Sequence, residues 1–265
     1  MLTVPSAGSA DVWWLDITSV NVGRAELAEL SLEEHKRAAA FAFRADRRRY
    51  TAAHVMLRRV LSGYLDFPPS SLIFHREPCP RCAKPTGRPA LELRYGVHFS
   101  LAHSGDAVLI AVASQQVGVD VEQQPTGCVC SMSADMNVAD AESGQSLSEA
   151  GRHDLVMRWW VRSEAVLKCT GEGIGHEVGE FPVLGQPGAP SGPGGPDQPV
   201  PATPVHGCSL ISLPAPVGYQ AALALAGSTR AIRLNVQAPW STGVRAPSRA
   251  PRPAEPPGSL THPVR

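Results

Sequence analysis

The sequence predicts an α+β fold, because its helical and strand-like patterns come in clusters rather than in strict alternation. Residues 47–65 and 154–170 show the apolar spacing of three to four residues that is typical of amphipathic helices. Around them, short β-branched runs bounded by glycine, proline or aspartate indicate strands. The chain of 265 residues, with a hydrophobic fraction of 43%, is long enough for one large domain or two small ones.

The first hundred residues are expected to contain strands, two helices and a turn-rich segment. Ser31 and Glu34 form a capping box, which is the usual start of a helix. Pro68 and Pro69 end the second helix, because proline cannot continue one. In chain order we expect a strand at residues 12–22, helices at 31–43 and 47–65, a short strand at 71–76 and turns at 78–89.

The remaining chain is expected to contain most of the strands and one long helix, with residues 103–106 as a turn between two strands. Residues 123–150 are weakly periodic and indicate a loop or a short helix. The Pro/Gly-rich insert 185–204 and the proline-rich tail 237–265 are expected to be disordered. We expect strands at residues 97–102, 107–113, 117–122, 177–184, 208–213, 219–226 and 231–236, and a helix at 154–170.

Composition and cysteine usage limit the broad class of the protein. The formal net charge is zero, so overall charge favours no partner. The start of the chain lacks the pattern of a signal peptide and no stretch of about 18 apolar residues occurs, so we expect a cytoplasmic protein with reduced thiols. Cys79-Pro-Arg-Cys82 resembles half a zinc site, but no second pair follows at zinc-finger spacing, which favours a turn.

Residues 117–122, VGVDVE, form a strand-like run that carries two acids. Asp120 and Glu122 are two residues apart, so their side chains leave a strand on the same face. A divalent cation between them would relieve their repulsion, and Mg²⁺ prefers such hard oxygen ligands. The alternative is that one acid pairs with an arginine and the other faces water.

The predicted helix 154–170 contributes a third acid and a lysine. Glu164 and Lys168 are four residues apart and share one face of that helix. Taken alone, they fit an exposed ion pair of little energetic weight. Taken with Asp120 and Glu122, they suit a phosphoryl-transfer site in which the lysine neutralises developing charge.

Basic residues gather in the first two predicted helices and in two later motifs. Arginine forks match the geometry of phosphate groups, although an arginine run is more often a solvated helix face. The residues concerned are Arg37, Arg44, Arg47, Arg48 and Arg49, then Arg88 in Thr-Gly-Arg-Pro and His103 in Ala-His-Ser-Gly. This set is suited to a polyphosphate ligand.

With these residues in hand, the sequence resembles the surfactin-type 4′-phosphopantetheinyl transferases over about residues 12–236, apart from the linkers. Such enzymes move the phosphopantetheine arm of coenzyme A to a serine of a carrier protein and release adenosine 3′,5′-bisphosphate. The likeness rests on the order and spacing of Gly87-Arg-Pro89, Phe99-Ser-Leu-Ala-His-Ser-Gly105, Val117-Gly-Val-Asp-Val-Glu122 and Trp160-Val-Arg-Ser-Glu-Ala-Val-Leu-Lys168 with Gly171-Glu-Gly173.

The resemblance implies a monomer of two similar, pseudo-symmetric α+β halves, residues 1–118 and 119–236, with coenzyme A and Mg²⁺ in the cleft between them. The implied partner is an acyl or peptidyl carrier protein, with no nucleic acid and no membrane. The implied Mg²⁺ ligands are Asp120, Glu122 and Glu164, with Glu164 also a candidate base. The implied phosphate contacts are Lys168 to the transferring group and Arg37, Arg49, Arg88 and His103 to coenzyme A.

Three positions depart from the family pattern. Ser163 stands where lysine is usual, Ala102 where a serine commonly precedes the histidine, and Thr86 where histidine is frequent. None of these changes removes an implied metal ligand. They leave open a catalytically silent paralogue that binds coenzyme A or carrier protein. A Mg²⁺-dependent hydrolase of nucleotide pyrophosphates is the third alternative.

Overall fold

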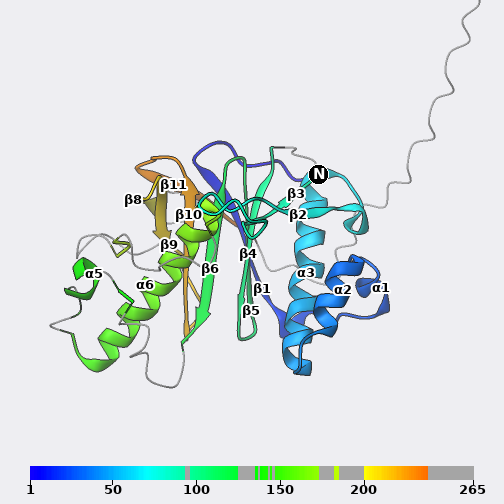
Figure 1. Cartoon of the computed structure of the whole chain (residues 1–265), viewed down its shortest axis with the longest axis horizontal. Coiled ribbons are helices and arrows are strands. Elements are labelled where there is room, and N and C mark those ends of the chain that lie inside the picture. Colours follow the sequence, from blue (N-terminus) through cyan, green and yellow to red (C-terminus); the bar gives the residue numbers. More distant parts are fainter. Residues whose placement is uncertain are drawn as a thin grey trace, which may run out of the picture.

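The computed structural model describes residues 1–92, 96–124, 135–136, 138–142, 144, 147–172, 182–184 and 200–237. These residues form a mixed α+β fold with two halves, which confirms the predicted fold class. Strands fill the centre of the molecule, and a long helix covers each flank (Figure 1). None of the helices within these ranges combines the length and apolarity needed to cross a membrane. The predicted tail, apart from Gln237, lies outside them.

The first half is a five-stranded sheet covered by the helix α3 (Arg44–Leu65). Its strands, in spatial order, are β4 (His98–Ser104), β5 (Ala107–Ala113), β1 (Ser9–Asp16), β11 (Ala231–Gln237) and β7 (Val200–Pro201). The last long strand, β11, runs parallel to β1, whereas the other pairs are antiparallel. Residues near the two ends of the described chain therefore share one sheet.

The second half is a four-stranded antiparallel sheet covered by the helix α6 (Glu149–Thr170). Its strands, in spatial order, are β6 (Val117–Gln123), β10 (Tyr219–Ala226), β9 (Cys208–Ser212) and β8 (Thr203–Val205). The two sheets pack against each other through a core that includes Val12 and Leu109 of the first and Val119 and Leu223 of the second. The layers are thus helix, sheet, sheet, helix, as Figure 1 shows.

Short elements complete the fold, and the predicted capping box is among them. The Ser31 hydroxyl accepts from the Glu34 N–H at 3.2 Å, and a Glu34 carboxylate oxygen accepts from the Ser31 N–H at 2.7 Å. The short elements are η1 (Ile17–Ser19), α1 (Arg24–Leu27), α2 (Leu32–Ala39), η2 (Pro69–Ser71), β2 (Phe74–Arg76), β3 (Pro89–Leu91) and α5 (Val138–Glu142).

Several predicted boundaries are wrong. The first strand ends at Asp16, whose carboxylate accepts from the Thr18 N–H at 2.8 Å and starts a 3₁₀ turn in place of the predicted strand to residue 22. The predicted turn 103–106 is shorter, because pairing of β4 with β5 continues to Ser104. Residues 200–204 were assigned to a disordered insert, yet they contribute to the strands β7 and β8. Residues 182–184 form no strand, and the rest of 177–184 lies outside the described residues.

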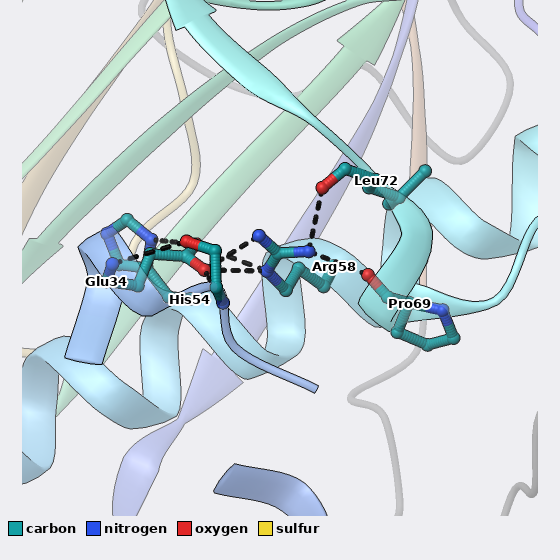
Figure 2. A network of polar contacts seen from close by, with 6 residues as sticks. Glu34, His54, Arg58, Pro69 and Leu72 are labelled. Atoms are coloured by element: carbon teal, nitrogen blue, oxygen red, sulfur yellow. Dashed lines mark hydrogen bonds and ion pairs between the residues drawn. The ribbon is translucent and has the colours of Figure 1, made fainter. Parts of the chain in front are cut away.

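A buried ion pair connects the helices α2 and α3 (Figure 2). Arg58 of α3 is 1% exposed, and it donates to both carboxylate oxygens of Glu34 and to the carbonyls of Pro69 and Leu72. His54 lies 3.0 Å from the same carboxylate. Burial alone would raise the pKa of Glu34, but the hydrogen bonds from His54 and Arg58 outweigh it and hold the pKa at about 2. The contact between α2 and α3 therefore depends on an ionised Glu34.

Gly118 of β6 allows α6 to lie directly on the second sheet. A Cβ atom at this position would lie 2.0 Å from the Ala165 carbonyl oxygen and 2.4 Å from the Cys169 backbone nitrogen, both in α6. Neither backbone atom can move without shifting the helix. The close approach of α6 to β6 is therefore possible only for glycine.

Glu34→Gln should make the free energy of unfolding less dependent on pH in the acidic range. A carboxyl group with a lowered folded pKa stabilises the fold above its unfolded value of 4.5, and this contribution is lost as pH falls through about 2. We expect urea unfolding to show a loss of about 3 kcal/mol at neutral pH, since Arg58 is left buried without its partner. Below pH 4.5 the curves should converge. Glu33→Gln, in an exposed pair with Lys36, is the control; parallel curves for Glu34→Gln and wild type would contradict this role.

Gly118→Ala should displace α6 from the sheet. Overpacking against rigid backbone costs about 1–3 kcal/mol or more, so thermal and urea unfolding should show a clear loss of stability. Gly151→Ala, within α6, is the matched control, because its added methyl meets only the side chains of Leu147 and Ser148, at 3.3 Å or more. Alanine favours helix formation over glycine by about 1 kcal/mol. Equal stability of the two variants would show that the contact between β6 and α6 at Gly118 can accommodate a methyl group.

Candidate active site

The close packing of α6 on β6 brings three of the predicted site residues together. Asp120 lies in the middle of β6, and its Oδ1 atom is 2.5 Å from Nζ of Lys168 on α6. Glu164 lies one helical turn before Lys168 and is 3% exposed, as deeply buried as Asp120 at 4%. The simpler interpretation of Glu164 and Lys168 as an exposed surface pair is therefore wrong for this protein.

Two buried carboxylate oxygens in this cluster lack a hydrogen-bond partner among the described residues. Within the part of the chain that the structure describes, Oδ2 of Asp120 and Oε1 of Glu164 are buried and have no hydrogen-bond partner. Burial raises the pKa of Asp120 to about 7, and the charges of Glu122 and Glu164 act in the same direction against Lys168. Burial likewise raises the pKa of Glu164. Unpaired buried anionic oxygens are costly, and a hard cation is the ligand that suits them.

Glu122 is held by a serine that the sequence reasoning missed. The Ser104 hydroxyl of β4 donates to Glu122 Oε2 at 2.6 Å and accepts from the Gln123 N–H at 3.0 Å. Four residues earlier on the same strand face, the Ser100 hydroxyl accepts from the Val119 N–H at 3.0 Å. The two serines thus accept hydrogen bonds from backbone N–H groups at the edge of β6 and link the two sheets. Their spacing in Phe-Ser-Leu-Ala-His-Ser was the available signal.

Asp120, Glu122 and Glu164 lie in one region but do not form a preorganised metal site. Across the described ranges, no three His, Cys, Asp or Glu side chains lie close enough together to hold an ion as they stand. The electrostatic coupling of Asp120 to both Glu122 and Glu164 nevertheless places them in one cluster. Their oxygens are of the type that Mg²⁺ binds, so the donor set fits such an ion.

Basic side chains, including His103, lie in the same region as the three acids. His103 lies exposed on β4, and its pKa is lowered first by partial desolvation and then by the positive charges of His54, Lys168 and Arg49. Arg49 pairs with Asp46 at 2.8 Å, while its buried Nε finds no hydrogen-bond partner among the described residues. Converging positive charges of this kind suit a phosphate ligand.

The other predicted phosphate contacts are placed differently. Arg37 is exposed at the end of α2, where its charge acts on Tyr50. Arg88 is tied down by Glu77, 2.8 Å from its Nε, and it donates to the carbonyl of Cys169 near the end of α6. Arg88 thus joins the segment before β3 to α6. A contact of either arginine with coenzyme A stays a prediction.

The three departures from the family pattern lie in different surroundings. Ser163 is buried on α6, and its hydroxyl makes no hydrogen bond within the described ranges. Ala102 is buried in β4, and Thr86 is exposed beside Gly87. None of the three displaces Asp120 or Glu164 from the cluster.

Comparison with known proteins finds similarity to one class of enzyme. A family profile described as 4′-phosphopantetheinyl transferase, N-terminal, matches residues 22–115. The chain is 35% identical over 153 residues to the 4′-phosphopantetheinyl transferase HetI of Nostoc sp., covering 56% of this chain and 62% of the relative. It is 29% identical over 160 residues to the 4′-phosphopantetheinyl transferase psf-1 of Bacillus pumilus, covering 57% and 62%. A Bacillus subtilis 4′-phosphopantetheinyl transferase is 20% identical over 157 residues, covering 59% and 67%.

The chain spans 62% of the length of the first two relatives. In the parts compared, the chain is similar to 4′-phosphopantetheinyl transferases. The resemblance inferred from the four sequence motifs is thereby confirmed.

Lys168→Met should raise the pKa of Asp120 above about 7 in a buffer without divalent ions, because the positive charge of Lys168, which lowers this pKa, is removed. A carboxyl group with a raised folded pKa stabilises the fold below its unfolded value of 3.8, and this contribution is lost as pH rises through the folded value. The variant should therefore continue to lose stability above pH 7, by about 1.4 kcal/mol for each unit of added shift. ¹³C NMR titration of labelled aspartate measures the pKa, with Lys36→Met as control; an unchanged Asp120 titration would contradict the pairing.

Proposed function

We propose that this protein transfers the 4′-phosphopantetheine arm of coenzyme A to a serine of an acyl or peptidyl carrier protein, releasing adenosine 3′,5′-bisphosphate. The similarity to 4′-phosphopantetheinyl transferases supports the reaction class. The observation that carries the proposal is the pair of buried, unpaired carboxylate oxygens of Asp120 and Glu164 beside Lys168. A fold does not retain such an arrangement for stability, since isolated buried charges weaken it.

A divalent cation, Mg²⁺ by the type of its ligands, belongs to this proposal. Asp120, Glu122 and Glu164 would hold it, and Ser104 orients Glu122 for that role. The ion supplies charge stabilisation to the pyrophosphate of coenzyme A. The two orphaned oxygens are the structural reason to expect it.

The side chains of the protein divide the remaining work. Glu164 is buried beside Asp120 and Lys168, and it is also the candidate base for the proton of the carrier serine. Lys168 directs its ammonium group into the cluster and would neutralise charge on the transferring phosphate. His103, Arg37, Arg49 and Arg88 are the proposed contacts to the other phosphates of coenzyme A.

The proposal also concerns the arrangement of the chain. Residues 1–118 would supply the phosphate contacts and residues 119–236 the metal ligands, although β7 and β11 of the second range pair within the first sheet. Coenzyme A would lie between them, where β4 meets β6 and the serines of β4 reach the second sheet. We propose that the active form is a monomer.

Carrier modification is the direct test of this proposal. The purified protein is incubated with coenzyme A, Mg²⁺ and an apo carrier protein, and the carrier is weighed by mass spectrometry. We expect a gain of one phosphopantetheine unit. Asp120→Asn and Glu164→Gln should each slow transfer by about 100-fold or more, since they remove a metal ligand or a base. Glu92→Gln, which changes an exposed carboxylate in the same way, is the matched control.

Two other outcomes would overturn the proposal. Tight coenzyme A binding with every tested carrier unmodified would indicate the silent paralogue that Ser163, Ala102 and Thr86 leave open. Release of free phosphopantetheine without carrier modification would indicate a hydrolase. Full activity of Asp120→Asn and Glu164→Gln would leave transfer intact but remove these residues from the mechanism.

A further inference from the structure

Cys79 and Cys82 lie on one tight turn that docks against the end of α6. The Ala83 N–H donates to the Cys79 carbonyl at 2.8 Å, and the Cys79 N–H donates to the Lys84 carbonyl at 2.8 Å. The turn folds Cys82 back towards Cys79, and a disulfide between them requires Cα atoms about 4.4–6.8 Å apart. The Cys79 side chain is close enough to Cys82 to help lower the pKa of its thiol.

The two cysteines differ in access. Cys82 is exposed at the surface, whereas Cys79 is 1% exposed and its thiol donates to the Glu172 carbonyl at 3.4 Å. The backbone N–H of Lys84 and then the Cys79 thiol favour the thiolate of Cys82 and lower its pKa. Cys82 is therefore placed to react first, and Cys79 lies directly behind it.

A second pair of cysteines provides an internal comparison. Cys169 of α6 and Cys208 of β9 are 0% and 3% exposed. The hydrogen bond to Cys208, followed by burial, raises the pKa of Cys169. A reagent in solution cannot reach either sulfur without opening the core, so this pair should be inert in the folded protein.

We propose that Cys82 and Cys79 form a thiol–disulfide exchange site for low-molecular-weight disulfides, with Cys82 as the attacking and Cys79 as the resolving cysteine. A zinc site is the other use of such a motif, but it needs four ligands. In the described part of the chain, no further His, Cys, Asp or Glu joins the two sulfurs to make a group able to hold a metal ion.

The exchange is balanced by one molecule of disulfide RSSR. The Cys82 thiolate attacks one sulfur of RSSR, the S–S bond breaks, and a thiolate RS⁻ leaves with the electron pair. Cys79 then loses its proton to solvent and attacks the Cys82 sulfur, which displaces the second RS⁻. The protein dithiol is oxidised by two electrons, the reagent is reduced to two thiols RSH, and excess dithiol reverses both steps.

The surroundings allow this change without unfolding. Oxidation removes the weak bond from the Cys79 thiol to the Glu172 carbonyl. The Glu172 side chain stays bound to Arg81 at 2.7 Å and to His206 at 2.9 Å. Because neither ion pair involves a sulfur atom, we expect the turn to stay attached to the segment that follows α6 when the cysteines are oxidised, as a reversible site requires.

The test uses the full chain with Cys128→Ser and Cys130→Ser, because these two cysteines lie outside the described residues. The reduced protein is treated with oxidised glutathione, quenched in acid and mapped by peptide mass spectrometry. We expect an internal disulfide between Cys79 and Cys82 that dithiothreitol reverses. Cys79→Ser should instead accumulate a stable glutathione adduct on Cys82. Cys82→Ser should react at least about tenfold more slowly than the parent.

Because Cys79 is buried, Cys79→Ala is made alongside Cys79→Ser, and circular dichroism confirms that each is folded. Either folded variant should give the same adduct. The proposal fails if the parent accumulates the adduct without closing the disulfide, or if Cys82→Ser oxidises as fast as the parent. It also fails if iodoacetamide labels Cys82 in the native protein no faster than Cys208. None of these measurements depends on transferase activity.

Discussion

The close contact of α6 with β6 at Gly118 is the constraint on which the candidate site depends. It places the backbone of Ala165 and Cys169 against the strand, and so brings Glu164 and Lys168 next to Asp120. A helix even slightly further away would leave room for water around these carboxylates. Their pKa values would then return towards those of exposed acids. The glycine of VGVDVE thus matters to the chemistry as much as its two acids do.

The sequence predicted the components of the site better than their connections. Asp120 and Glu122 could be paired from the strand period, and Glu164 and Lys168 from the helix period, because both depend only on local geometry. The strands β5 and β10 were predicted with their observed limits for the same reason. Local patterns contain no information on which distant segments meet.

The parts that sequence reasoning missed are those decided by long-range packing. The parallel pairing of β11 with β1 joins segments more than two hundred residues apart, for example Ser9 with Arg233. Ser104 contacts Glu122 only because two separate sheets meet at β4 and β6. The strands β7 and β8 lie in a proline-rich stretch, where pairing with β11 and β9 overrides a composition that favours disorder.

Buried charges in this fold are of two kinds, and the contrast between them separates structural from functional residues. Both long helices bury an arginine. Arg58 of α3 is saturated by Glu34 and two carbonyls, and Arg162 of α6 donates to the Val183 carbonyl at 2.6 Å and to Ser212 at 3.1 Å. These groups are satisfied and support the fold. Asp120 and Glu164 are equally buried, yet each keeps an oxygen that the described residues do not satisfy. Because the same fold satisfies Arg58 and Arg162 at comparable depth, these two adjacent exceptions are best explained by a ligand that arrives from outside.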